Sequence, residues 1–126
     1  MVVYHKYSKR KVSGGRYVHP KGKKQSNVGS LPTFTKIEET KIKVKREKGG
    51  SAKPVLLASN KINVTDPKTK KTKVTEIVTA IENKANRNFV RRNIITKGTI
   101  LETKLGKVRI TSRPGQEGAI NGVLIS

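Results

Sequence analysis

From Glu38 onward, the apolar and polar residues follow the pattern of short β-strands. Residues 41–46 alternate strictly, so Ile42 and Val44 fall on one face and cations fall on the other. Val and Ile make up 24 of the 32 Val, Ile, Leu and Phe residues of the chain, and 12 Thr add to the β-branched content. Side chains of this shape suit a pleated sheet. The sequence therefore predicts an all-β body.

Polar turns separate the other expected strands of the body. These strands cover residues 53–58, 62–64, 89–96, 98–104, 107–111 and 119–125. Turns or loops are expected at 65–71, 83–88, 105–106 and 113–118, where Asp, Asn, Pro and Gly gather. About six or seven short strands at this spacing predict a small closed antiparallel β-barrel, in which no sheet edge is left free.

Residues 72–82 fit two patterns. The segment has four apolar side chains at the i, i+3, i+4, i+7 spacing of a helical face, namely Val74, Ile77, Val78 and Ile81. These four Val and Ile residues share its 11 positions with three Thr, however, and no clear helix C-cap follows. We predict a strand, with a helix as the alternative.

The first 36 residues differ from the body in both charge and pattern. Residues 1–37 contain no Asp or Glu but nine Lys and Arg, with Gly, Pro and Tyr scattered among them. Without a helical or strand period, this segment cannot bury enough apolar surface to offset its ordering entropy. We expect a basic RNA-binding N-terminal extension over 1–36, which orders on its partner, and a β-barrel domain over 37–126.

The net charge indicates the kind of partner. The 126 residues include 29 Lys and Arg against 8 Asp and Glu, a formal charge of +21. Nucleic acid is the usual polyanion for such a domain, because each phosphate contact releases counterions. A membrane is disfavoured, since the chain has no Trp and only two Phe to anchor an amphipathic helix. We expect nucleic acid as the partner, no membrane, and no independent homo-oligomer.

Catalysis and metal binding have little support in the sequence. The absence of Cys removes disulfides, thiol nucleophiles and cysteine-based zinc sites, and it fits a reducing compartment such as the cytoplasm. The only histidines, His5 and His19, lie in the acid-free extension. Residues 21–24 (KGKK) lack the spacing of a phosphate-binding glycine loop. A small basic ribonuclease would need a positioned acid and base, so we expect no enzyme, no metal and no cofactor.

Two short stretches are the main candidate RNA contacts. Residues 8–16 place four cations around a Gly pair, where backbone can approach phosphates closely. We expect RNA contact here, with a flexible basic linker as the alternative. Arg91 and Arg92 are expected at the start of a strand, beside an Asn-rich loop, with both guanidinium groups open to phosphate. The alternative for this pair is an ion pair with Glu82 or Glu102, which would stabilise an exposed site by only about 0–1 kcal/mol.

A third candidate is the Pro-Gly loop at 112–118. It either offers Arg113 and backbone amides to RNA or only closes the barrel, and the sequence favours neither. The complete set of candidate RNA-binding residues is Lys6, Lys9, Arg10, Lys11, Gly14, Gly15, Arg16, Tyr17, Lys21, Lys23, Lys24, Arg87, Arg91, Arg92, Lys97 and Arg113.

Three stretches together resemble a known family. Residues 88–125 (NFVRRNIITKGTILETKLGKVRITSRPGQEGAINGVLI), 63–73 (NVTDPKTKKTK) and 8–16 (SKRKVSGGR) are similar to the small-subunit ribosomal protein family numbered eight with the e-type suffix, shared by archaea and eukaryotes. The resemblance spans essentially the whole chain, and the lack of a long insertion is typical of archaeal members. Only the opening residues 1–5 depart from the expected pattern.

The resemblance implies a definite role. It implies a β-barrel with a basic extension threaded into small-subunit ribosomal RNA, and neighbouring ribosomal proteins as further partners. It also implies a place in the cytoplasmic ribosome, where the protein supports subunit assembly and translation and catalyses no reaction. Charge alone leaves an alternative, a general nucleic-acid-binding module of the chromatin or translation-factor type, because DNA and RNA both attract Lys and Arg through phosphate.

Overall fold

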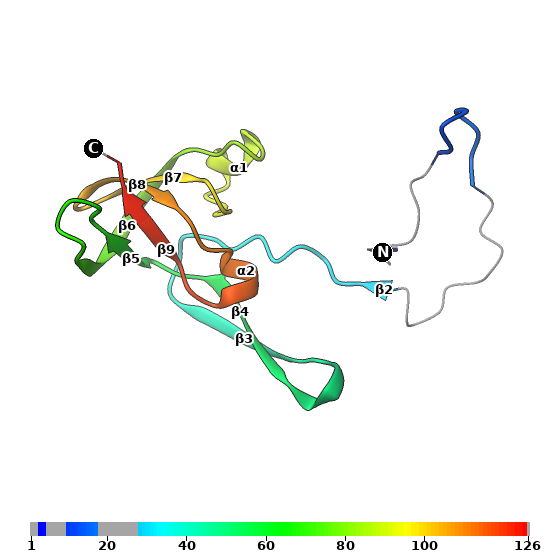
Figure 1. Cartoon of the computed structure of the whole chain (residues 1–126), viewed down its shortest axis with the longest axis horizontal. Helices are drawn as coiled ribbons and strands as arrows, with labels where there is room; N and C mark the ends of the chain where they lie inside the picture. Colours follow the sequence, from blue (N-terminus) through cyan, green and yellow to red (C-terminus); the bar gives the residue numbers. More distant parts are fainter. Residues whose placement is uncertain (1–2, 5–9, 18–27, 126) are drawn as a thin grey trace. The chain divides into compact units, whose positions relative to one another are not determined.

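A computed structural model describes residues 3–4, 10–17 and 28–125 of the chain (Figure 1). The chain divides into two units, Met1–Pro32 and Thr33–Ser126. The described elements of the first unit are β1 (Val3–Tyr4) and β2 (Val28–Gly29). Those of the second are β3 (Lys41–Arg46), η2 (Lys48–Gly50), β4 (Ala52–Ala58), β5 (Lys61–Thr65), β6 (Thr72–Glu82), α1 (Asn88–Arg91), β7 (Ile100–Thr103), β8 (Gly106–Ile110), α2 (Pro114–Glu117) and β9 (Asn121–Leu124).

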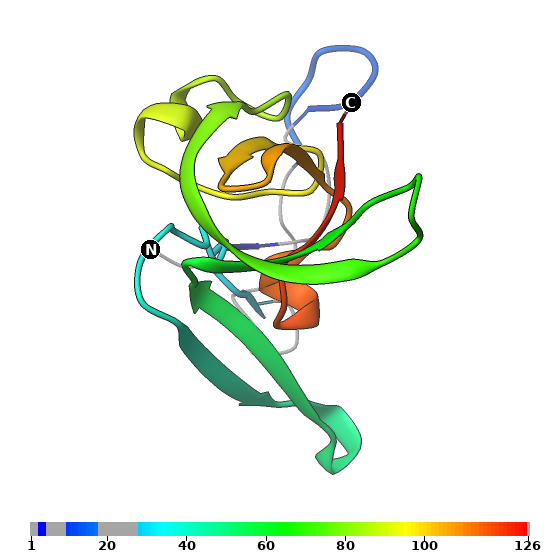
Figure 2. The ribbon, with the colours of Figure 1, turned by 90° about the vertical axis from the view of Figure 1, so that its left-hand side faces the viewer.

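Five strands close into a barrel in the order β5-β6-β7-β8-β9 (Figure 2). This confirms the predicted all-β fold with a small closed barrel. Four neighbouring pairs are antiparallel, but β5 and β9 close the barrel in parallel, with Val64 opposite Gly122. The parallel pair has a geometric cause. When an odd number of strands alternates in direction, the first and last strands point the same way.

The interior of the barrel is filled by branched side chains from every barrel strand. Ile62 and Val64 of β5, Ile77 of β6, Leu101 of β7 and Val108 of β8 are buried in one cluster with Ile110 and Ile120. Gly122 of β9 lies so close to β8 that a Cβ atom there would stand 2.5 Å from Cγ1 of Val108. The barrel is therefore a packed core rather than a container for a ligand.

The ambiguous segment 72–82 is a strand, as predicted. β6 pairs with β5 on one side and with β7 on the other. Ile77 points into the core, whereas Val74 and Val78 are exposed. A helix would have gathered these side chains on one face, but the alternation of the pleated strand sends them to opposite sides of the sheet.

A second sheet consists of β3 and β4 only. Figure 1 shows this hairpin reaching away from the barrel, with η2 at its tip. The predicted strands are confirmed, and Ile42 and Val44 do share a face, opposite Leu56 and Pro54. Both are more than half exposed, however, so this face of β3 lies outside the packed core.

The strand predicted at 89–96 is wrong. Residues Asn88–Arg91 form the short helix α1, and the next strand begins only at Ile100. Asparagines provide the local cause: Asn86 Oδ1 accepts the N–H of Asn88 at 2.9 Å, and Asn93 adopts a left-handed φ of 50° that ends the turn. Asn tolerates this conformation better than most residues, so the chain turns where β-branched neighbours favoured a strand.

Two predicted turns also differ in detail. The loop expected at 113–118 contains helix α2, which begins with Pro114, a residue suited to a first helical turn, and ends at Gly118 with a φ of 72°. Gly106, expected within a turn, is the first residue of β8. The turn at 65–71 is confirmed, and Asp66 Oδ1 accepts the N–H of Lys68 there at 2.9 Å.

Residues 33–37 join the second unit along β4. The N–H of Lys36 donates to the carbonyl of Leu57 at 3.1 Å, and the N–H of Ile95 donates to the carbonyl of Thr35 at 2.8 Å. These residues therefore link β4 to the segment that follows α1. The functional division at residue 36, between an RNA-binding extension and a barrel, stays a prediction.

Candidate nucleic-acid interface

A tight turn carries the described basic residues of the first unit. The N–H of Lys11 donates to the carbonyl of Gly15 at 2.8 Å, and the N–H of Gly14 donates back to the carbonyl of Lys11 at 3.0 Å. Gly14 has a φ of 82°, which glycine adopts without steric cost. This is the pattern of a hairpin loop with a left-handed glycine, and it sets Arg10 opposite Arg16.

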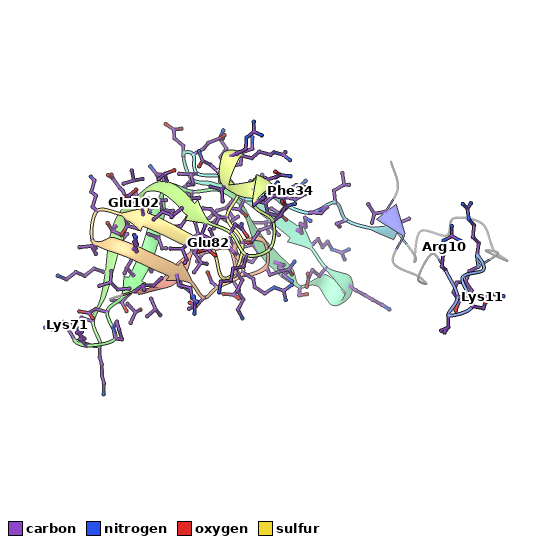
Figure 3. All side chains as sticks on the ribbon, turned by 90° about the horizontal axis from the view of Figure 1, so that it is seen from above. Arg10, Lys11, Phe34, Lys71, Glu82 and Glu102 are labelled. Atoms are coloured by element: carbon purple, nitrogen blue, oxygen red, sulfur yellow. The ribbon has the colours of Figure 1, made fainter. Side chains whose placement is uncertain are left out.

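The side chains of this turn are presented to the outside. Arg10 Nη1 donates to the carbonyl of Gly14 at 2.8 Å, and Lys11 Nζ lies 5.7 Å from the ring centroid of Tyr17, within range of a cation–π contact. Figure 3 labels Arg10 and Lys11. The structure thus brings together six predicted site residues, all of them exposed: Arg10, Lys11, Gly14, Gly15, Arg16 and Tyr17.

Several predicted contacts lie outside the described residues. These are Lys6, Lys9, Lys21, Lys23 and Lys24. Their assignment to RNA binding rests on the sequence.

Helix α1 carries three of the predicted arginines. Arg87 precedes the helix, Arg91 is its last residue and Arg92 follows it, and all three side chains are exposed. The Arg92 guanidinium carbon lies 5.9 Å from the ring centroid of Phe34. That ring in turn meets Phe89 edge-on at 5.7 Å. The short helix is therefore anchored by an aromatic pair, with the guanidinium groups at its surface.

No ion pair holds Arg91 or Arg92 among the described residues. The ion pairs found there join Lys53 to Glu47 and Lys104 to Glu76. The alternative in which an arginine of this pair binds Glu82 or Glu102 is thus not formed. The guanidinium groups keep their donors available for an external acceptor such as phosphate.

Asn83 ties two cation-bearing segments together from inside. This residue is only 5% exposed. Its Oδ1 accepts hydrogen bonds from the N–H of Ala85 at 2.9 Å and from the hydroxyl of Thr96 at 3.1 Å. Its Nδ2 donates to the carbonyl of Ile94 at 3.3 Å. One buried amide therefore holds the loop with Lys84 and Arg87 against the segment that leads to Lys97.

Lys97 borders a shallow hollow at the surface of the barrel. Behind it, the buried hydroxyl of Thr99 accepts the N–H of Thr96 at 3.1 Å, and the N–H of Gly98 donates to the carbonyl of Ile110 at 2.9 Å. The backbone under the hollow is thus held by hydrogen bonds. The residues that line it are Lys84, Lys97, Gly98, Arg109, Ile110 and Thr111.

Lys84 and Arg109 were missed among the candidates from sequence. Arg109 alternates with the buried Val108 and Ile110 in β8, so it is the outward cation of a half-buried strand. That alternation was a usable signal. The proximity of Arg109 to Lys84 and Lys97 could not be predicted from the sequence, because it depends on how the barrel closes.

Arg113 lies at the start of α2 with its side chain exposed. Most amides of this loop are already hydrogen-bonded, since the N–H groups of Gln116 and Glu117 donate to the carbonyl of Arg113 at 2.8 and 2.9 Å. The N–H of Gly118 donates to the carbonyl of Pro114 at 3.2 Å. The loop therefore uses these amides to form α2, and the Arg113 side chain is exposed to a ligand.

The acids of the second unit do little to neutralise these cations. The pKa of Glu76 is lowered by its hydrogen bond and charge attraction to Lys104, and the pKa of Asp66 is lowered mainly by the N–H of Lys68 and the hydroxyl of Thr69. Both carboxylates lie away from the hollow at Lys97.

In the part of the chain that the structure describes, no helix is long and apolar enough to cross a membrane.

Comparison with known proteins identifies the family. The family model described as "Ribosomal protein S8e" matches residues 4–125. A protein of Methanobrevibacter smithii named small ribosomal subunit protein eS8 is 48% identical over 118 residues, which cover 94% of each chain. The protein of the same name from Methanococcus aeolicus is 45% identical over 128 residues, covering 100% of this chain and 99% of the relative. This chain belongs to the ribosomal protein S8e family.

Proposed function

We propose that this chain is a structural, non-catalytic protein of the small ribosomal subunit that binds ribosomal RNA through two basic surfaces. The first is the turn at residues 10–17. The second, called here the barrel cation surface, comprises Lys84, Arg87, Arg91, Arg92, Lys97 and Arg109. The extension and Arg113 add further phosphate contacts. The protein thereby stabilises folded RNA and supports subunit assembly and translation in the cytoplasm.

The observation that carries this proposal is the excess of cations over the acids that could neutralise them. The chain has a formal charge of +21, and the ion pairs among its described residues use only two lysines. A phosphate backbone would neutralise the remaining cations and release its counterions. Homo-oligomers are disfavoured for the same reason, since two such chains repel each other.

The rigidity of the barrel cation surface supports recognition of RNA by shape. Asn83 and Thr99 are buried and hydrogen-bonded beneath it, so the spacing of Lys84, Lys97 and Arg109 is set before binding. Folded RNA presents phosphates at defined positions, and fixed cations can match that arrangement without reading bases. The exposed aromatic ring of Tyr17, which Lys11 contacts, has the chemistry to stack on an unpaired base or ribose.

Three matched variants of the full chain test the two surfaces. The turn variant carries R10A, K11A and R16A, and the barrel variant carries K84A, K97A and R109A. The control variant removes the same charge from the β3–β4 hairpin with K41A, K43A and K48A. Affinity for small-subunit ribosomal RNA is measured across a salt series, after thermal unfolding has shown that each variant is folded.

We expect the turn and barrel variants to bind more weakly, with the slope of log affinity against log salt reduced by about 2 to 3 in each, because each lost phosphate contact lowers it by about 1. The control variant should keep a slope close to that of the unmodified chain. If all three variants lose the same affinity, only net charge matters, and the two surfaces have no special part in binding.

A further inference from the structure

The outer face of β6 carries three exposed, branched apolar side chains. Val74 is 68% exposed, Val78 is 60% exposed and Ile81 is 41% exposed. Single exposed apolar residues are ordinary on a protein surface, but three along one strand of a charged protein form a stripe. Glu76, which is ion-paired to Lys104, lies between Val74 and Val78 on the same face. The stripe follows a single strand, so its geometry is fixed by the pairing of the barrel.

Alternation from the buried Ile77 places Val74 and Val78 on the outer face, and an irregularity of the sheet adds Ile81 to it. The register between β6 and β7 shifts between Ile77 and Thr79 and again between Ala80 and Glu82. Val78 and Ile81 are the extra residues at these two bulges. A bulge redirects side chains that a regular pleat would place differently.

Two carboxylates flank the stripe, and the next outward residues across β7 are the cations Lys107 and Arg109 of β8. Glu82 pairs with Ile100, and Glu102 pairs with Thr79, so both carboxylates lie on the outer side, opposite the buried Leu101. Figure 3 labels Glu82 and Glu102. Among the residues that the structure describes, neither takes part in an ion pair, although Lys107 is the cross-strand neighbour of Glu102.

These features disfavour RNA and a second copy of the chain as the occupant. Phosphates would meet two unpaired carboxylates, and the apolar stripe would gain nothing from a sugar-phosphate backbone. A second copy would bring another charge of +21. A protein segment with apolar side chains flanked by Lys or Arg would bury the stripe and neutralise the carboxylates at its rim, which is the usual anatomy of a protein interface.

We infer that the outer face of β6 and β7, comprising Val74, Val78, Ile81, Glu82 and Glu102, binds a basic segment of a neighbouring protein in the small subunit. This face, called here the β6 face, leaves RNA to the cations elsewhere on the chain. The inference rests on the proposed function only for the chain's place in the subunit. It adds the chemistry of a protein partner and the residues that contact it.

Photo-crosslinking in assembled small subunits tests this assignment. The full chain is produced with p-benzoylphenylalanine at position 78 in one variant and at position 97 in another, and small subunits containing each are irradiated. Digestion and mass spectrometry then identify what is attached. Position 78 should cross-link to a ribosomal protein, within a peptide that has apolar residues flanked by Lys or Arg, and position 97 should cross-link to RNA.

The two positions separate the possible failures. If position 78 attaches to RNA, to nothing, or to an acidic peptide while position 97 attaches to RNA, the inference is wrong and the proposed function stands. If position 97 attaches to no RNA, the proposed RNA contact of the barrel fails, and position 78 alone decides the inference. If the chain does not enter small subunits, the proposed function and the inference both fail.

A charge substitution provides an independent readout. V78K places a cation on the β6 face, and V44K places one on the similarly exposed β3 hairpin as the matched control. We expect V78K to lower the occupancy of the cross-linked neighbour in small subunits at least threefold, with binding to isolated ribosomal RNA undiminished. Equal occupancy in V78K and V44K subunits would overturn the assignment.

Discussion

The hydroxyl of Thr96 donates a hydrogen bond to Oδ1 of Asn83 at 3.1 Å, across the point where β6 ends and the chain returns toward β7. This contact joins the loop that carries Lys84 to the segment that carries Lys97. Both residues line the hollow of the barrel cation surface. The spacing of these cations, and with it the proposed binding of RNA, therefore depends on a buried amide that contacts no ligand.

Replacement of that amide should weaken both folding and binding. N83A leaves the carbonyl of Ile94 and the N–H of Ala85 without their partner, so we expect a loss of about 1–3 kcal/mol in the free energy of unfolding. Urea unfolding of the full chain measures it. The control is N63A, since Asn63 makes only an exposed side-chain bond to Asn121, and its change should stay within about 0.5 kcal/mol. Equal effects in both variants would contradict the role given to Asn83.

Packing against β9 predicts a second large effect. G122A would bring its Cβ to 2.5 Å from Val108 Cγ1 and to 3.0 Å from the carbonyl oxygen of Arg109, in a fully packed core. We expect a destabilisation of about 1–3 kcal/mol, as overpacked cores show. G15A provides the comparison, because its Cβ would meet only Ser13 Oγ at 3.8 Å. Thermal unfolding that finds G122A as stable as G15A would refute the close approach of β8 and β9.

The turn before β6 predicts a dependence of stability on pH. The pKa of Asp66 in the folded chain lies below its ordinary value of 3.8, mainly because the N–H of Lys68 and the hydroxyl of Thr69 donate to the carboxylate. A lowered folded pKa means that the stabilisation is present above the unfolded pKa and is lost as the pH falls through the folded pKa.

We therefore expect the unmodified chain to exceed D66N in unfolding free energy at neutral pH, with a difference that shrinks below pH 3.8. Urea unfolding at a series of pH values measures this difference. The difference in unfolding free energy between the unmodified chain and E76Q should likewise shrink below pH 4.5, the ordinary pKa of Glu, because the contact with Lys104 lowers the pKa of Glu76. If either difference does not change with pH, the charged form of that carboxylate does not stabilise the folded chain.

The two adjacent arginines after Val90 should contribute differently to the stability of the fold. Arg92 lies over the ring of Phe34, whereas Arg91 makes no such ring contact in the described structure. We expect R92A to reduce the unfolding free energy by about 0.5–1 kcal/mol, the usual range for an exposed cation–π contact. R91A should change it by less than about 0.5 kcal/mol, and both variants should bind RNA more weakly. Equal stability of the two variants would argue against the contact with Phe34.

Strand periodicity in the sequence predicted most of the barrel, because alternation reports directly on a half-buried strand. It failed at residues 89–96, where two neighbouring isoleucines, Ile94 and Ile95, are both buried outside any strand. Both the local sequence and a tertiary contact cause this difference. Asn86 and Asn93 favour a turn, and the Phe34 ring, from a distant part of the sequence, packs on Phe89.

The candidate site was predictable only as far as it depends on composition and local sequence. The turn at residues 10–17 follows from its Gly pair and its cations, which lie together in the chain. The surface around Lys97 could not be found in that way, because Lys84 and Arg109 reach it from different strands of a closed barrel. Likewise, the two β6 bulges depend on pairing with β7, which no single stretch of sequence encodes.

The most direct test of the central claim is the affinity of the full chain for small-subunit ribosomal RNA and for duplex DNA of equal length, measured across the same salt series. Our account predicts tighter binding to the ribosomal RNA at every salt concentration, because fixed cations on the barrel match the phosphates of folded RNA. Equal affinity for both nucleic acids at each salt concentration would contradict it and would leave only a general attraction to polyanions.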